Sequence, residues 1–315
     1  MSKIFSSSSS DVVVNINKKK KTLTVFNLTG LTPYATAWQF QKVLSEHIHQ
    51  SRKSSSLKDK DKQYEDESVD YLILVEHPRI FTLGRGASEK NIKFNFNKKK
   101  EVEESAIRKN SVDYFEESND DDGICLKEKN NDEVSVVRVE RGGEVTWHGP
   151  GQLVAYPILD LNNFKRDLHW YTHALEETVI QTMSTFGIHG QRSEVNTGVW
   201  VGVNKLSAVG VAASRWITMH GSSLNVCCNM SDFSRIIPCG ITVDGRGVCS
   251  MQQLRPELNI QNTDAIRLLY ARSFAQTFGV DTLNILTKDE SLVKLNTLLD
   301  IDYPNIKNLD VHKLF

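Results

Sequence analysis

Apolar residues recur every three or four positions in three stretches of the chain, a spacing that predicts amphipathic helices. These stretches are residues 33–49, 167–186 and 263–278. Glycine follows the second and the third, as Gly187 and Gly279, and a left-handed glycine commonly ends a helix. The pattern therefore predicts three helices, two of which have a defined end.

Shorter apolar runs predict strands between and after these helices. They lie at residues 71–75, 134–139, 152–159, 199–203, 206–211 and 216–226. The last three follow one another with only short turns between them. Strands joined as hairpins, combined with a few helices, indicate an α+β domain and argue against a doubly wound parallel sheet.

Three segments are expected outside the core, and two of them, residues 51–68 and 95–133, contain too few apolar residues to fold alone. Residues 1–22 hold a serine run and a lysine run, and they are interpreted either as a disordered tail or as an organelle transit segment. Residues 51–68 and 95–133 predict disordered insertions in surface loops. The expected organisation is a single domain over residues 23–285, followed by a C-terminal tail of unclear role at residues 286–315.

Composition excludes several classes of protein. Hydrophobic residues make up 39% of the 315, and the net charge of −1 indicates neither a nucleic-acid surface nor a polybasic membrane patch. The sequence has no apolar run of about 18 residues, so no transmembrane helix is expected. The five cysteines are odd in number and form no CxxC pair, which predicts neither a disulfide scaffold nor a structural zinc site.

Two clusters have the composition of ligand-binding loops. Residues 141–152 contain four glycines. Glycine lets a backbone approach a ligand closely and frees amide groups to bind it, although an ordinary turn between two strands is the alternative interpretation. Residues 219–225 place His220 beside small residues that leave room next to a pocket, and a hydrogen-bonded structural histidine is the alternative there.

Two further clusters contain residues that can react. Lys205 is expected at a turn between two apolar strands, where it is either solvated or drawn against a pocket as a fixed cation. Cys239 lies between Pro238 and Gly240, in a segment that must turn. A cysteine is usually a small buried residue, but one beside a loop amide is also suited to be a nucleophile. Cys227 and Cys228 are interpreted as packing residues, and Cys125 and Cys249 receive no role.

Blocks of sequence in a fixed order extend from about residue 33 to residue 251. They are Pro33-Tyr34, Ala37-Trp38, Gln41, Glu76-His77-Pro78, 81–85, 141–152, 156–159, 198–202, Lys205, His220-Gly221, 224–226 and Pro238-Cys239-Gly240. In this order the blocks resemble the lipoyl(octanoyl) transferases of lipoate synthesis. That family is similar in fold to biotin and lipoate protein ligases, which implies a mixed β-sheet flanked by helices.

The resemblance implies a two-step acyl transfer. An octanoyl group leaves the phosphopantetheine arm of acyl carrier protein for Cys239, and a lysine of a lipoyl domain then accepts it as an amide. Lys205 matches the lysine that lowers the pKa of the family's catalytic cysteine and transfers protons. The substrate-binding positions of the family match Arg141, Gly142, Gly143, Glu144, Val145, Thr146, Trp147, His148, Ala208, Val209, Gly210, Gly221, Ser222 and Ser223.

The resemblance also implies the partners and the setting. The partners are acyl carrier protein and lipoyl-domain proteins, namely the glycine cleavage H protein and the E2 subunits of 2-oxoacid dehydrogenases. It implies no metal and no cofactor of the enzyme's own. Because the family's eukaryotic members work in mitochondria and long insertions suggest a eukaryotic source, a mitochondrial location is expected, or a cytoplasmic one if residues 1–22 are not a transit segment. Ser222 and Ser223 depart from the family's bulkier apolar residue and alanine, which changes the expected shape of the acyl pocket.

Two rival functions stay open. An ATP-dependent lipoate or biotin protein ligase would share the glycine-rich strand and the lysine, but an adenylating enzyme needs no nucleophile at Cys239. A non-enzymatic carrier-binding protein of the same fold would use Cys239 and Lys205 only for packing.

Overall fold

The structure of the protein is a computed structural model. It describes residues 20–57, 68–94, 125–127, 133–194, 196–241 and 245–299. Within these ranges, no helix combines the length and the apolar character that crossing a membrane requires.

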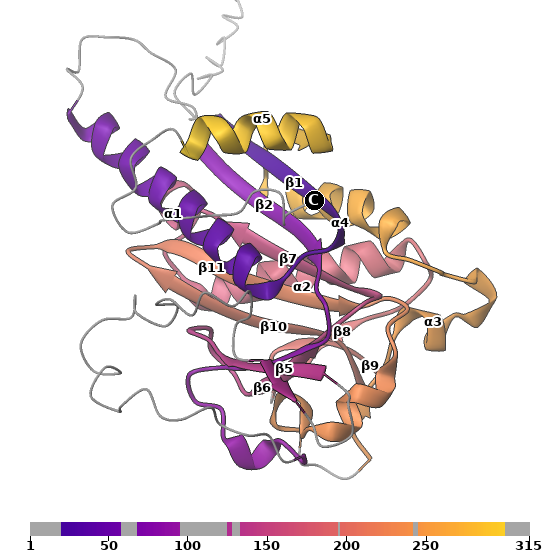
Figure 1. The fold of residues 1–315 in the computed structure, drawn as a ribbon. Helices are drawn as coiled ribbons and strands as arrows, with labels where there is room; N and C mark the ends of the chain where they lie inside the picture. The colour runs from indigo at the N-terminus through magenta and orange to yellow at the C-terminus, as the bar shows by residue number, and fades with distance from the viewer. Residues whose placement is uncertain are drawn as a thin grey trace, which may run out of the picture.

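One large mixed sheet forms the centre of the fold (Figure 1). Its strands are β1 (Lys21–Leu31), β2 (Ser68–Glu76), β7 (Gln152–Ile158), β8 (Gln191–Arg192), β9 (Gly198–Val201), β10 (Asn204–Ser214), β11 (Ile217–Asn225), β12 (Gly247–Val248) and β13 (Thr282–Leu286). Their order is β13-β1-β2-β7-β11-β10-β9-β8, with β12 beside β10. β1 pairs in parallel with both β13 and β2, whereas the neighbours from β2 to β8 pair antiparallel. The predicted α+β fold with a mixed sheet is confirmed.

Helices cover both faces of this sheet because successive side chains of a strand point to opposite faces. Tyr71 and Ile73 pack under α1 (Tyr34–Leu57) and α5 (Lys288–Leu299). Leu72 and Leu74 pack on the other face, under α2 (Leu168–Ser184) and α4 (Asp264–Phe278). The short helix α3 (Met251–Leu254) follows β12.

A smaller sheet lies beside the large one and carries the glycine-rich segment. Its strands are β4 (Cys125–Lys127), β5 (Glu133–Arg138), β3 (Ile80–Leu83) and β6 (Val145–His148), in that order. Phe81, Val145 and Trp147 form its core together with Phe233. Five 3-10 turns complete the described fold: η1 (Glu89–Asn91), η2 (Leu161–Asn163), η3 (Met230–Arg235), η4 (Pro238–Gly240) and η5 (Pro256–Leu258).

The three predicted helices form where the apolar spacing places them, as α1, α2 and α4. α4 ends at Gly279, which is left-handed as expected. The six predicted strands form as β2, β5, β7, β9, β10 and β11. The pattern missed β1 and the small strands β3 and β6, whose pairing partners lie far away in the sequence.

The two predicted insertions contain more regular structure than expected. α1 runs without a glycine or proline break to Leu57, so residues 51–57 are helical rather than disordered. Within 95–133, β4 pairs antiparallel with β5, which itself begins at Glu133. The remainder of both segments lies outside the described residues, apart from Ser68, where β2 begins.

The C-terminal segment is part of the domain rather than a tail over its described length. β13 ends at Leu286, and α5 buries Leu295 and Leu298 in the core under α1. At the other end, β1 begins at Lys21, inside the segment expected to be a tail. Residues 1–19 and 300–315 lie outside the described residues.

A buried ion pair fixes the turn between β6 and β7. Arg267 of α4 is 2% exposed and donates to Glu76 Oε1 at 3.1 Å. The other oxygen of that carboxylate accepts the backbone N–H of Gly151 at 2.7 Å. The hydroxyl of Thr263, which precedes α4, also donates to Glu76, at 2.6 Å, instead of capping the helix. Arg267 and Glu76 therefore anchor the glycine-rich segment from behind.

Replacing Arg267 with methionine is expected to destabilise the protein by about 3–5 kcal/mol, because the Glu76 carboxylate is left largely buried without its cation. The free energy of unfolding in urea measures this loss. Arg272→Met on the same helix is the matched control, because Arg272 is exposed and its loss should change stability by less than about 0.5 kcal/mol. Equal stabilities of the two variants would contradict the anchoring role.

Candidate active site

A cavity of about 370 Å³ opens between the small sheet and strands β10 and β11. The two strands pair so that Gly210 faces Gly221. A Cβ at Gly210 would lie 3.1 Å from Arg141 Cδ, and one at Gly221 would lie 2.2 Å from the carbonyl oxygen of Ala155. These glycines therefore let the Arg141 side chain and the next strand pack directly against the backbone.

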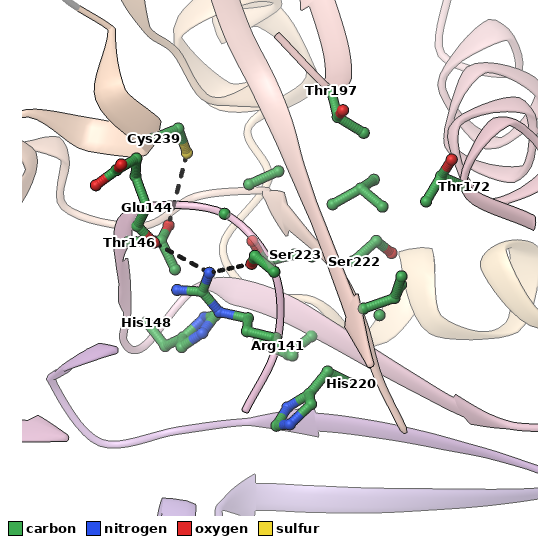
Figure 2. Close-up of a pocket in the computed structure, with 18 of the residues that line it drawn as sticks. Arg141, Glu144, Thr146, His148, Thr172, Thr197, His220, Ser222, Ser223 and Cys239 are labelled. Carbon is green, nitrogen blue, oxygen red and sulfur yellow. Dashed lines mark hydrogen bonds between the residues drawn. The ribbon is translucent and has the colours of Figure 1, made fainter. Parts of the chain in front are cut away.

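Cys239 projects into this cavity from η4 (Figure 2). Its φ of 54° and the φ of 68° at Gly240 are both left-handed. A left-handed residue that carries a side chain is uncommon and costs energy, and such residues cluster at functional sites. The thiol is half-buried, and its Sγ lies 4.0 Å from Thr146 Oγ1. The turn thus presents a sulfur atom to the cavity at the expense of backbone strain.

Lys205, the second residue of β10, reaches the same cavity and is 2% exposed. Its ammonium donates to Asn196 Oδ1 and, at 3.0 Å, to the carbonyl oxygen of Thr197. Burial lowers the pKa of Lys205, while interactions with Cys239 and the charge of Glu176 oppose that change. Lys205 and Cys239, which the sequence blocks singled out, therefore line the same cavity.

Arg141 brings a second cation to the cavity. Its guanidinium donates to the carbonyl oxygens of Gly142 and Glu144 at 2.9 and 3.0 Å, and to two oxygens of Thr82 at 2.8 Å each. All four acceptors are neutral. Burial lowers the pKa of Arg141, and the nearby Tyr34 and Cys239 oppose this. The positive charge is thus rigidly held without being neutralised by these acceptors, and it favours a negative charge on the sulfur or on a bound substrate.

His148 forms a neutral part of the wall. Its Nδ1 lies 2.7 Å from Gln152 Oε1. Because the amide nitrogen of Gln152 donates to Trp147 O and Asn225 Oδ1, its oxygen must accept, and Nδ1 of His148 carries the proton. Burial lowers the pKa of His148 to about 3. The ring is therefore uncharged at neutral pH, and its Nε2 carries no proton.

His220 also lines the cavity, and its backbone is left-handed with φ of 59°. Its Nε2 lies 3.6 Å from Glu140 Oε2. Although burial opposes it, the interactions of Glu140 with His220 and Trp38 lower the pKa of that carboxyl to about 2. This network connects the cavity wall to α1, which supplies Trp38.

Most of the predicted site residues come together at this cavity. They are Cys239, Lys205, Arg141, Gly142, Gly143, Glu144, Thr146, His148, Ala208, Val209, Gly210, Gly221, Ser222 and Ser223. Val145 and Trp147 do not line it, which corrects the assignment of the whole segment: alternation along β6 turns them into the core of the small sheet. The Ser222 hydroxyl is 2.7 Å from that of Tyr270, so a helix of the core satisfies it.

Several residues at the cavity were not predicted as site residues. They are Tyr34, Val154, Tyr156, Thr172, Asn196, Thr197, Val211 and His220. Tyr34, Tyr156 and His220 belong to the sequence blocks that match the family, so this match could have identified them as site residues. Asn196 and Thr197 lie in a loop without periodicity, and only the fold brings them to Lys205.

Three other cysteines, Cys227, Cys228 and Cys249, do not line this cavity. Cys227, Cys228 and Cys249 are free thiols, and burial raises the pKa of each. Packing is the role that their positions support. Across the described ranges, no three histidine, cysteine or carboxylate side chains gather in a way that could hold a metal ion.

Comparison with known proteins identifies similar sequences over most of the chain. Residues 33–268 match the lipoyl protein ligase A/B catalytic domain. The chain is 38% identical over 262 residues to an octanoyltransferase of Nostoc punctiforme, covering 82% of this chain and 90% of that protein. It is also 38% identical over 253 residues to an octanoyltransferase of Gloeobacter violaceus, covering 80% and 88%.

Solved structures share the fold at low sequence identity. A bi-partite lipoate protein ligase from Thermoplasma acidophilum matches with a TM-score of 0.51 and 14% identity, over 90% of this chain and 93% of that one. LipL1 of P. falciparum, solved in complex with lipoate, matches with a TM-score of 0.52 and 13% identity, over 89% and 70%. The predicted likeness to lipoate protein ligases is confirmed for the fold.

Proposed function

The chain belongs to the octanoyltransferase family, whose members carry the lipoyl protein ligase A/B catalytic domain, and we propose that Cys239 and Lys205 perform its acyl transfer. The enzyme is an acyltransferase that moves an octanoyl group from acyl carrier protein to lipoyl domains. One observation carries the assignment of residues: a strained loop cysteine and a buried lysine meet at a single cavity.

In the first step, the Cys239 thiolate attacks the thioester carbonyl of the octanoyl carrier. A bond forms between Sγ and the carbonyl carbon, the bond to the carrier sulfur breaks, and Lys205 gives a proton to the leaving thiolate. A free cysteine has a pKa of about 8.5 and is only a few per cent thiolate at pH 7, so a nearby ammonium raises the reactive fraction. Arg141 adds a second positive charge near the sulfur.

In the second step, the amine of a lipoyl-domain lysine attacks the acyl-enzyme. The carbon–sulfur bond to Cys239 breaks, an amide forms, and Lys205 takes up the surplus proton. Acylation removes the thiolate charge that had opposed the lowering of the Lys205 pKa by burial. Lys205 is therefore more readily neutral in the acyl-enzyme than in the free enzyme, which suits a proton acceptor. The thiolate and ammonium are restored at the end.

The lipoyl-domain substrates that we infer are the glycine cleavage H protein and the E2 subunits of 2-oxoacid dehydrogenases. The support is the family resemblance, since each presents a lysine on a lipoyl domain. The mitochondrial location stays a prediction, because it depends on residues 1–22, of which residues 1–19 lie outside the described part of the chain.

Purified protein is expected to transfer octanoate from its carrier to a lipoyl domain at the same rate with and without ATP. Exchange of one thioester for another is nearly balanced in free energy, so no activation by a nucleotide is needed. Mass spectrometry of the lipoyl domain measures the product. Transfer only from free octanoate, and only with ATP, would favour the ligase alternative, while binding of the carrier without transfer would favour a non-enzymatic protein.

A further inference from the structure

One side chain contacts both members of the proposed catalytic pair, and no step above uses it. Asn196 precedes β9 and lines the cavity. Its Oδ1 accepts a hydrogen bond from Lys205 Nζ, and its Nδ2 donates to the carbonyl oxygen of Cys239 at 3.0 Å. An ammonium only donates and a carbonyl only accepts, so these two partners fix the orientation of the amide.

We propose that Asn196 is a positioning residue, which ties the Lys205 ammonium to the backbone of Cys239 and so fixes where the cation lies relative to the thiol. This inference rests on the proposed function of the pair. Asn196 is suited to the role because one planar amide joins the lysine side chain to the backbone of the nucleophile. The separation of the two groups is then set by a single rigid unit rather than by two independent loops.

The backbone around Asn196 is itself held in place. The indole N–H of Trp200 donates to the Asn196 carbonyl oxygen at 3.0 Å. Two residues further on, the N–H of Gly198 donates to the buried carboxylate of Glu176 at 2.7 Å. A Cβ at Gly198 would lie 2.4 Å from the carbonyl oxygen of Ser207, so the segment packs directly on β10. Asn196 therefore presents its amide from an anchored support.

The three N–H groups of the Lys205 ammonium show how this amide acts. One donates to Asn196 Oδ1 and one to the carbonyl oxygen of Thr197, which leaves the third N–H for a group in the cavity that Cys239 also lines. Two fixed acceptors direct the third N–H. Without the Asn196 amide the ammonium loses one of its two fixed acceptors, and the strained turn at Cys239 loses the hydrogen bond on its carbonyl.

Other charged and titratable groups face the pair from several elements, and a substitution of Asn196 leaves all of them in place. They are Glu176 of α2, whose charge acts on Lys205, Arg246 on the Trp200 ring, and Arg141, Glu144 and the neutral His148 at the cavity. Figure 2 shows the last three together with Cys239. A change in thiol reactivity in an Asn196 variant therefore reports the amide contacts themselves.

The test compares Asn196→Ala and the nearly isosteric Asn196→Asp with the full-length wild-type chain. The rate of iodoacetamide alkylation of Cys239 is followed from pH 5 to 10, together with octanoyl transfer and thermal unfolding. Asn196→Ala should move the midpoint of the alkylation profile upward by about one pH unit. It should slow transfer by about 10- to 100-fold, because the reacting groups lose their alignment.

Asn196→Asp should move the midpoint at least as far, because its carboxylate competes for the ammonium and repels the thiolate. The aspartate variant also keeps the test decisive if the alanine variant does not fold. Gln191→Ala, an exposed change on β8, is the matched control and should match wild type.

The outcomes separate this inference from the proposed function. If wild-type Cys239 acquired no octanoyl adduct, the proposed function would be overturned. An adduct on wild-type Cys239 together with unmoved alkylation midpoints in both variants would overturn only the role of Asn196. Slower transfer with an unmoved midpoint would show a merely structural role and would also overturn it.

Discussion

Replacing Cys239 with alanine abolishes the acyl-enzyme and lowers octanoyl transfer by about 10³-fold or more, because the nucleophile that receives the acyl group is removed. The thiol is half-buried and contacts Thr146 Oγ1 only at 4.0 Å, so its loss removes little packing. Alanine is also a small residue that fits the same turn. Thermal unfolding of the variant should stay close to that of wild type. Initial rates of lipoyl-domain octanoylation, with intact mass of the enzyme, measure both effects.

Cys227→Ala is the matched control for this experiment. Cys227 is another half-buried free thiol, but burial raises its pKa and it does not line the cavity. This variant should keep the acyl-enzyme and the wild-type rate. An acyl-enzyme that persists in Cys239→Ala, or disappears in Cys227→Ala, would move the nucleophile to another residue.

Replacing Lys205 with methionine is expected to slow transfer by about 10²- to 10⁴-fold, the usual contribution of a general acid–base group. The sign of the pH effect follows from the charge. Lys205 is a cation beside the sulfur, so its removal makes the thiolate harder to form, and the alkylation profile of Cys239 should move to higher pH by about one to two units. Methionine keeps the length of the aliphatic stem of Lys205, which is buried against Gly198.

Lys205→Arg separates the two roles of the lysine. Arginine keeps the positive charge but cannot release a proton near neutral pH. It should therefore hold the alkylation profile closer to wild type than methionine does, while transfer remains slow. Lys165→Met, at an exposed lysine, is the control and should change neither quantity. An unchanged alkylation profile in Lys205→Met would show that the charge of Lys205 does not act on the thiol.

Local sequence signals singled out Cys239 and Lys205, which the structure brings to one cavity, but not Asn196, which contacts both. Cys239 could be singled out because it stands between a proline and a glycine in a segment that must turn, and Lys205 because it is expected at a turn between two apolar strands and matches the family's lysine. Asn196 carries no such signal. It acts through the carbonyl of Cys239, 43 residues away, and only the completed fold brings the two together.

The same limit explains the errors in the fold. The spacing of apolar residues predicted the helices α2 and α4, which are amphipathic. It also predicted the hairpins from β9 to β11, whose strands are neighbours in the sequence. β1 and α5 were not predicted. β1 pairs with β2 and β13, and α5 packs on β1 and α1, and these partners lie far away in the sequence. Val145 and Trp147 were grouped with the cavity because a matching block does not show which way alternate side chains point.

In the proposed mechanism, one sulfur atom carries the octanoyl group between carrier and acceptor. The most direct test of this mechanism mixes the wild-type chain with octanoyl carrier protein, without nucleotide and without acceptor, and maps the modified peptide by mass spectrometry. We expect one octanoyl group per chain, on the peptide that contains Cys239, and we expect hydroxylamine to release it as it releases a thioester. An unmodified chain, or an octanoyl group on any other residue, would contradict this mechanism.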